Sequence, residues 1–349
     1  MNTDFGIDNG YDLYRKTMKR DARRIFSRFN LGLFAFTAVS YVSIFIIEIA
    51  LMILLGEKFN DLLGNVYFTT LLSIAPLYVF GLPMLVAIVS GMPKKKLEKS
   101  KIPFSEFIVI FLIAQFLMSI GNVIGNALNF IFSRILNKEI TNSTSELIDE
   151  MPIWLMTLLV VIIVPLAEEF IFRKLMIDRL SRCGNVIAIL VSSVAFALFH
   201  GNFYQFFYAC FVGFVLGYVY VRSGRLIYSY ILHALLNFLG SVALMPIIKM
   251  SEELTVFFEN ISNGVSIDIE RFIMCAMGVS SYSIVQNVTV LAGLVLFVTV
   301  ITKKLIKIKS DPVINIPRED VASVTLLNVG TILFIGVSLI VFAASIFLV

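Results

Sequence analysis

The sequence is poor in charged residues. Only 15% of its 349 residues are Asp, Glu, Lys or Arg, against about 25% in an ordinary soluble protein, whereas 58% are hydrophobic. A soluble domain of this size could not bury that much apolar surface, which excludes a soluble enzyme and a disordered chain. The composition predicts instead an all-α polytopic membrane protein.

Cysteine and histidine are also scarce. The three cysteines, Cys183, Cys210 and Cys275, are too few and too scattered for a disulfide framework or a zinc cluster. The net charge of +4 is small, and the basic residues fall where the cytoplasmic loops of a membrane protein would lie. We therefore expect no nucleic-acid partner. Since the chain has only two histidines, the position of each one is informative.

Nine apolar runs are long enough, or nearly so, to cross a hydrocarbon core about 30 Å thick. They follow a basic segment at 1–30 and make 31–349 a single transmembrane helical domain. The predicted spans are 31–55, 65–91, 104–136, 152–175, 185–201, 204–222, 226–246, 282–302 and 323–348.

Basic and non-basic loops alternate along the chain, which predicts the orientation of the protein in the membrane. By the positive-inside rule the N-terminus is cytoplasmic and, with nine spans, the C-terminus lies outside. Residues 11–30 suit either a helix lying on anionic lipid or a solvated basic tail. The longest non-basic loop, 247–281, is expected to lie over the outer face. The basic segments are 1–30, 94–101, 173–182, 222–225 and 303–309.

Ionisable residues inside hydrocarbon are costly, and here they gather within 165–237. Glu168 and Glu169 end an apolar run that contains Pro165, which is expected to kink the helix. Glu169 and Arg173 are four residues apart and share a helix face, so this pair can be neutral. Glu168 points away and lacks that partner, which suits a general acid or base. A salt-bridge cluster anchoring a helix end is the alternative.

Both histidines lie close to this acidic pair. His233 and Asn237 are four residues apart, so both side chains can face one site and donate hydrogen bonds to an oxyanion. Gly184 lies midway between Glu168 and His200. If Gly184 is the apex of an antiparallel helical hairpin, Glu168 and His200 lie at one level on facing helices. A carboxylate and an imidazole could then share one water molecule.

The order of these residues resembles a known family. Glu-Glu-x-x-x-Arg at 168–173, Phe-x-x-x-His at 196–200 and His-x-x-x-Asn at 233–237 are similar to the three motifs of the CPBP family. That family contains type II CAAX prenyl endopeptidases and bacterial proteins linked to bacteriocin processing and self-immunity. The resemblance covers about 150–245, the predicted catalytic core in spans four to seven.

This resemblance implies an intramembrane endopeptidase of the glutamic type that needs no cofactor. In the family the first glutamate and the first histidine activate water, which assigns the base to Glu168 and the holding of the water to His200. The last motif stabilises the oxyanion, which assigns that role to His233 and Asn237. The family site faces the cytoplasm. The residues expected to support the catalytic ones are Glu169, Arg173 and Phe196.

The resemblance also implies a substrate and a location. We expect a membrane-bound peptide or protein precursor, such as a bacteriocin, in a bacterial plasma membrane. Three alternatives stay open: a metalloprotease with zinc on Glu168, His200 and His233, a non-catalytic immunity or scaffold protein, and a transporter that uses Glu48.

Overall fold

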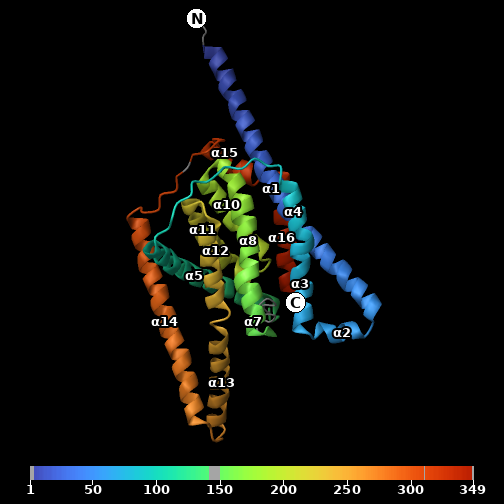
Figure 1. Cartoon of the computed structure of the whole chain (residues 1–349), viewed down its shortest axis with the longest axis vertical. Coiled ribbons are helices and arrows are strands. Elements are labelled where there is room, and N and C mark those ends of the chain that lie inside the picture. Colours follow the sequence, from blue (N-terminus) through green and yellow to red (C-terminus); the bar gives the residue numbers. More distant parts are fainter. Residues whose placement is uncertain (1–3, 141–149, 310, 348–349) are drawn as a thin grey trace.

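The computed structural model describes residues 4–140, 150–309 and 311–347, and every regular element in these ranges is helical (Figure 1). The prediction of an all-α polytopic membrane protein is confirmed. Eight helical stretches are long and apolar enough to cross a membrane, and the apolar helix Asn185–Phe199 is shorter. The main helices are α1 Asp4–Leu55, α2 Lys58–Leu63, α3 Val66–Pro76, α4 Leu82–Val89, α5 Phe104–Leu136, α10 Asn185–Phe199, α11 Phe203–Ser223, α12 Leu226–Gly240, α13 Met245–Ser262, α14 Ile269–Thr302, α15 Arg318–Thr325 and α16 Val329–Phe347.

One predicted loop is wrong. Most of the segment 247–281 is helical: α13 runs to Ser262, and α14 begins at Ile269, well before the predicted start of the eighth span. Glu253 and Arg271 join the two helices through two contacts of 2.7 and 2.6 Å. We call residues 245–281 the arm, because they project beyond the other helices at one end of the molecule (Figure 1). Its polar residues interrupt the hydropathy pattern without interrupting the helices.

The basic loops meet at the end of the molecule opposite the arm. The backbone N–H of Lys95 donates to the carbonyl of Asp178, and that of Ser100 donates to Ser223. The N–H of Ile314 donates to Arg182, which brings in the segment that follows α14. We call this end, formed by residues 94–101, 178–185, 222–225, 303–309 and 311–314, the basic face. The predicted alternation of loops therefore corresponds to two distinct ends of one helical bundle.

Helix α1 is continuous from the basic N-terminal segment into the first span. Phe26 and Phe29 are fully buried in the largest core cluster. Closer to the N-terminus, Lys19 binds Asp320 of α15 at 2.7 Å, and Arg15 binds the same carboxylate at 3.0 Å. One face of the second half of the 11–30 segment is thus packed against the protein, while Arg23, Arg24 and Arg28 on the other face are exposed.

Glycines allow the helices around the site to approach closely. A Cβ atom at Gly121 of α5 would collide with the backbone of Tyr208 in α11, and one at Gly125 would collide with the carbonyl of Phe203. Gly213 of α11 lies less close to α10, where a Cβ atom would be 3.2 Å from the Cα of Ser193. The contacts hold α11 between α5 and α10, which fixes one wall of the site.

Candidate active site

The acidic pair lies in a helical stretch whose winding changes several times. After α7 (Ile153–Met156) the chain follows a π-helix, η2 (Thr157–Ile163), then the short α-helix α8 (Val164–Glu169), then a second π-helix, η3 (Phe170–Ile177). Pro165 occupies the first turn of α8, where its missing N–H is tolerated. Such π segments are frequent at functional sites. Glu168 and Glu169 therefore sit on a short turn whose orientation is set by the π-helices on both sides.

A tight turn brings the first histidine motif back to this pair. η3 leads through α9 (Asp178–Leu180) to η4 (Ser181–Cys183), and Gly184 follows with a φ of 119°, which favours glycine. Helix α10 then returns antiparallel along η3. Arg173 Nη1 and the Ser192 hydroxyl lie 3.0 Å apart, and that hydroxyl donates to the carbonyl of Phe172 at 2.8 Å. The predicted hairpin apex is confirmed.

Four charged or ionisable side chains form a continuous chain inside the protein. Arg173 Nε donates to Glu169 Oε2 at 3.2 Å, and both side chains are fully buried. Glu169 Oε1 accepts from His233 Nδ1 at 3.1 Å. The other ring nitrogen of His233, Nε2, lies 3.6 Å from Glu168 Oε2. Because a carboxylate beside a guanidinium is an acceptor, the Nδ1 proton is directed at Glu169 and Nε2 is left facing Glu168.

This series of contacts differs from the one that we predicted around Glu168. We expected Glu169 and Arg173 to fix Glu168, but Glu169 binds His233 and reaches Glu168 only through that imidazole. Two adjacent glutamates point about 100° apart on a helix, so the sequence could place them on different faces but could not name the partner of each. The pairing follows from the position of α12, which the sequence does not reveal.

Phe196 lies between the two histidines. Its ring packs edge-on against the rings of His200 and His233, with centroids 4.7 and 5.7 Å apart, and the Arg173 guanidinium lies 5.3 Å from its centre. His200 Nδ1 is 2.8 Å from the carbonyl of Phe196. A carbonyl can only accept, so Nδ1 carries the proton and the lone pair of neutral His200 is on Nε2. The ring of Phe196 thus helps to orient His233, and its backbone carbonyl sets the tautomer of His200.

Asn237 is held by the first π-helix. Its side-chain Nδ2 donates to the carbonyl of Val160 in η2 at 2.9 Å. The second hydrogen on Nδ2 and the oxygen Oδ1 remain for other partners. His233 and Asn237 lie one helical turn apart on α12, and the contacts with Glu169 and Val160 align both with the acidic pair.

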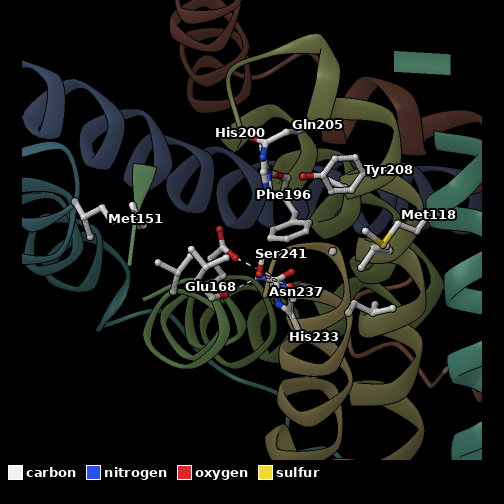
Figure 2. A pocket seen from close by; sticks show the side chains of 17 residues that line it. Met118, Met151, Glu168, Phe196, His200, Gln205, Tyr208, His233, Asn237 and Ser241 are labelled. Atoms are coloured by element: carbon white, nitrogen blue, oxygen red, sulfur yellow. Dashed lines mark hydrogen bonds and ion pairs between the residues drawn. The ribbon is translucent and has the colours of Figure 1, made fainter. Parts of the chain in front are cut away.

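The predicted residues surround a cavity of about 310 Å³ (Figure 2). Glu168, His200, His233 and Asn237 all line it, as does Phe196. Glu169 and Arg173 lie behind the wall, fully buried. The cavity is within the size range of small-molecule and peptide side-chain sites, and most of its wall is apolar. A polar cluster at an apolar wall suits a reaction in which few waters take part.

Some cavity residues were not predicted. Tyr208 and Gln205 come from α11, and Ser241 follows the end of α12 (Figure 2). Asn202 caps α11 by accepting from the N–H of Gln205 at 2.9 Å, and its amide donates to the carbonyl of His200 at 3.0 Å. The Asn-x-x-Gln pattern directly after His200 was the available signal, because Asn before an apolar run is a common helix cap. Nothing in the sequence pointed to Tyr208 or Ser241.

The expected zinc ligands do not form a metal site in this geometry. Across 4–140, 150–309 and 311–347, no group of three or more His, Cys, Asp and Glu side chains is arranged to hold a metal ion. The proposed zinc ligands Glu168, His200 and His233 all line the cavity, but His233 is engaged by a carboxylate on each side. We therefore derive no step through a metal.

Comparison with known proteins shows what the segment that carries this site is similar to. Residues 150–239 match the family described as Type II CAAX prenyl endopeptidase Rce1-like. UPF0177 protein YxdF of Lactococcus lactis is 32% identical over 101 residues, which are 29% of this chain and 56% of that protein. "Putative membrane peptidase YdiL" of Bacillus subtilis is 24% identical over 191 residues, which are 54% of this chain and 78% of that protein. No solved structure matches significantly.

The matches coincide with the motifs. The family match includes Glu168, His200, His233 and Asn237, and it ends close to the end of α12. The resemblance to the CPBP family of intramembrane proteases is therefore confirmed over the segment that carries the motifs. The chain spans little more than half the length of YxdF, and the flanking helices α1 to α5 and α13 to α16 lie outside the family match.

Proposed function

We propose that the protein is an intramembrane endopeptidase that hydrolyses a peptide bond of a membrane-bound peptide or protein. The observation that carries this proposal is the buried chain from Arg173 through Glu169 and His233 to Glu168, which ends at a cavity. A purely structural Arg173–Glu169 ion pair would not require a further carboxylate, Glu168, at the cavity wall. Similarity to the prenyl endopeptidase family and to a protein named as a membrane peptidase supports the reaction class.

In the proposed reaction Glu168 is the general base. It accepts a proton from a water molecule as the water oxygen attacks the carbonyl carbon of the substrate. The C–N bond then breaks, and Glu168 returns the proton to the leaving amine, so the products are one carboxylate and one amine. His200 holds the water through the lone pair of Nε2, since its Nδ1 proton is directed at the carbonyl of Phe196.

The developing oxyanion is stabilised from α12. His233 in its protonated form donates from Nε2, and Asn237 donates through the Nδ2 hydrogen that Val160 does not use. Glu169 stabilises that protonated imidazole through Nδ1, and Arg173 keeps Glu169 ionised in a buried position. Removal of one oxyanion donor costs about 10²–10³-fold in rate in well-studied hydrolases.

The test compares two glutamates in the native host. Cells lacking the protein are complemented with wild-type protein, with Glu168→Gln or with Glu253→Gln, at equal membrane abundance. Glu253 belongs to the arm and lies outside the cavity wall. We expect Glu168→Gln to reproduce the peptide profile of the deletion strain, with one precursor accumulating, and to lower turnover by about 10²–10⁴-fold. Glu253→Gln should restore the wild-type profile.

Two results would contradict this proposal. Full restoration by Glu168→Gln would make the carboxylate structural and favour the non-catalytic immunity or scaffold protein. Stoichiometric zinc in active, detergent-purified protein would replace the mechanism of side-chain catalysis with a metal-dependent one.

A further inference from the structure

The cavity lies in the half of the bundle away from the basic face. Its wall includes Gly240 and Ser241, where α12 ends, Met151 just before α7, and Gln205 in the first turn of α11. All four belong to helix ends opposite the basic face, because the other ends of these helices lead to residues 178–185 and 222–225. Gly240 is exposed, so the cavity reaches the surface at this end.

The wall residues nearest the basic face are still deep in the bundle. His233 lies about 12 Å from Arg225, at 1.5 Å per residue of helix. Phe196 and Val212 lie further from the loops at their own ends of α10 and α11. The cavity therefore occupies the middle and the far half of the bundle.

A hydrogen-bonded layer closes the bundle on the basic side. The hydroxyl of Tyr220 donates to Asp178 Oδ1 at 2.7 Å, and Asp178 binds Lys174 at 2.8 Å. Arg179 donates to the carbonyls of Val89 and Leu175. Arg179 and Tyr220 are among the largest fully buried side chains of the described residues. This layer lies on the basic-face side of the acidic pair, so a peptide that entered from that side would have to break it.

We infer that the cavity takes its substrate from the extracytoplasmic side, and that the scissile bond lies near the extracytoplasmic end of a membrane-anchored peptide or protein. That a bond is cleaved in this cavity rests on the proposed function. That the open end faces the extracytoplasmic side rests on the positive-inside rule. The cavity wall also contains Ile74, Met118 and Val164, so the bound segment is apolar on several sides. The family resemblance implies a site that faces the cytoplasm, but the closed layer lies on that side of the cavity.

Accessibility of single cysteines tests the inference without any substrate. The three native cysteines are replaced by Ala, and one cysteine is placed at Gly240 in the cavity wall, at Lys99 on the basic face or at Ser262 in the arm. Lys99 and Ser262 are both exposed, so they form a matched pair of reporters for the two sides. Intact cells are treated with a membrane-impermeant thiol reagent, and each variant is normalised to its own labelling in detergent.

We expect Gly240→Cys and Ser262→Cys to be labelled in intact cells at least 10-fold more than Lys99→Cys. Permeabilising the membrane should raise only the labelling of Lys99→Cys. Labelling of Gly240→Cys no higher than that of Lys99→Cys would overturn the inference, as would an exchange of the two reporters. Because labelling needs no proteolysis, these results stand whether or not Glu168→Gln abolishes activity.

Discussion

The protein contains two Arg–Glu pairs of the same chemistry in opposite surroundings. In the core, Arg173 and Glu169 share one contact of 3.2 Å on a single helical stretch, and neither side chain is exposed. In the arm, Arg271 donates two short hydrogen bonds to Glu253 between α13 and α14. The side chain of Arg271 is 42% exposed and that of Glu253 is 38% exposed. The arm pair has the better geometry, but the core pair has no solvent to replace either partner. Surroundings, more than contact distance, therefore decide what each pair does.

The two pairs also differ in what lies next to them. Glu169 uses its second oxygen to bind His233, so the core pair is connected to the cavity. Glu253 also accepts from the thiol of Cys275 at 3.4 Å, within the arm. The core pair contacts a side chain that lines the cavity, and the arm pair joins two helices.

The largest expected effect comes from breaking the core pair. Arg173→Met leaves Glu169 as a buried charge without its guanidinium partner, which should cost about 3–5 kcal/mol of stability. The melting temperature in detergent should fall, and activity should be lost. Arg271→Met, measured in parallel, should shift the melting temperature little. Adding Glu169→Gln to Arg173→Met should recover part of the loss, because no charge then remains unpaired. Equal shifts for the two single variants would contradict the comparison.

A smaller effect comes from two glycines at helix contacts. A Cβ at Gly121 would meet the backbone of Tyr208, whereas one at Gly278 in the arm would meet the flexible end of Met250. Gly121→Ala should therefore destabilise by about 1–3 kcal/mol, since α11 must move away from α5. Gly278→Ala should be close to neutral because Met250 can change its rotamer. Thermal melts of both variants, with turnover for Gly121→Ala, check this; a neutral Gly121→Ala would show that the α5–α11 contact can relax.

The smallest expected effect is a pH dependence outside both regions, where α1 meets α15. Hydrogen bonds from Lys19 and Arg15 lower the pKa of Asp320 below its ordinary value of 3.8. A lowered pKa in the folded state means that the contribution is fully present above pH 3.8 and is lost as the pH falls through the lowered value. The melting temperature of wild type minus that of Asp320→Asn should therefore be constant at neutral pH and shrink toward zero in strong acid. A constant difference down to the lowest pH would refute the role of this carboxylate.

Much of the fold could be predicted because apolar length and loop charge are local properties. The span at 104–136 coincides with α5, and Gly184 forms the expected turn. The arm could not be predicted in this way. Its helices hold polar residues that pair only across the hairpin, as Glu253 does with Arg271, and Phe257 and Phe258 pack on Phe272. A hydropathy window does not register contacts between two helices.

For the site, the residue types and spacings indicated a shared location, but not its connections. Both π-helices leave the apolar pattern unchanged, so the changes in winding around Glu168 cannot be recognised in the sequence. Those changes set which carboxylate meets His233 and which carbonyl meets Asn237. The depth of the cavity likewise depends on how α10, α11 and α12 pack together, and helix length alone does not determine that packing.

The first π-helix also restricts how the cavity can open. Two side chains of α12 reach its carbonyls: Asn237 donates to Val160, and the hydroxyl of Tyr230 donates to Ile162 at 3.4 Å. These two residues are about two turns apart on α12, so the helix is attached to η2 at two points along its length. A sliding motion of α12 by one turn, about 5.4 Å, would break both contacts at once. These contacts hold η2 and α12 together as one wall of the cavity. We therefore expect any opening of the cavity to come from movement of the opposite wall.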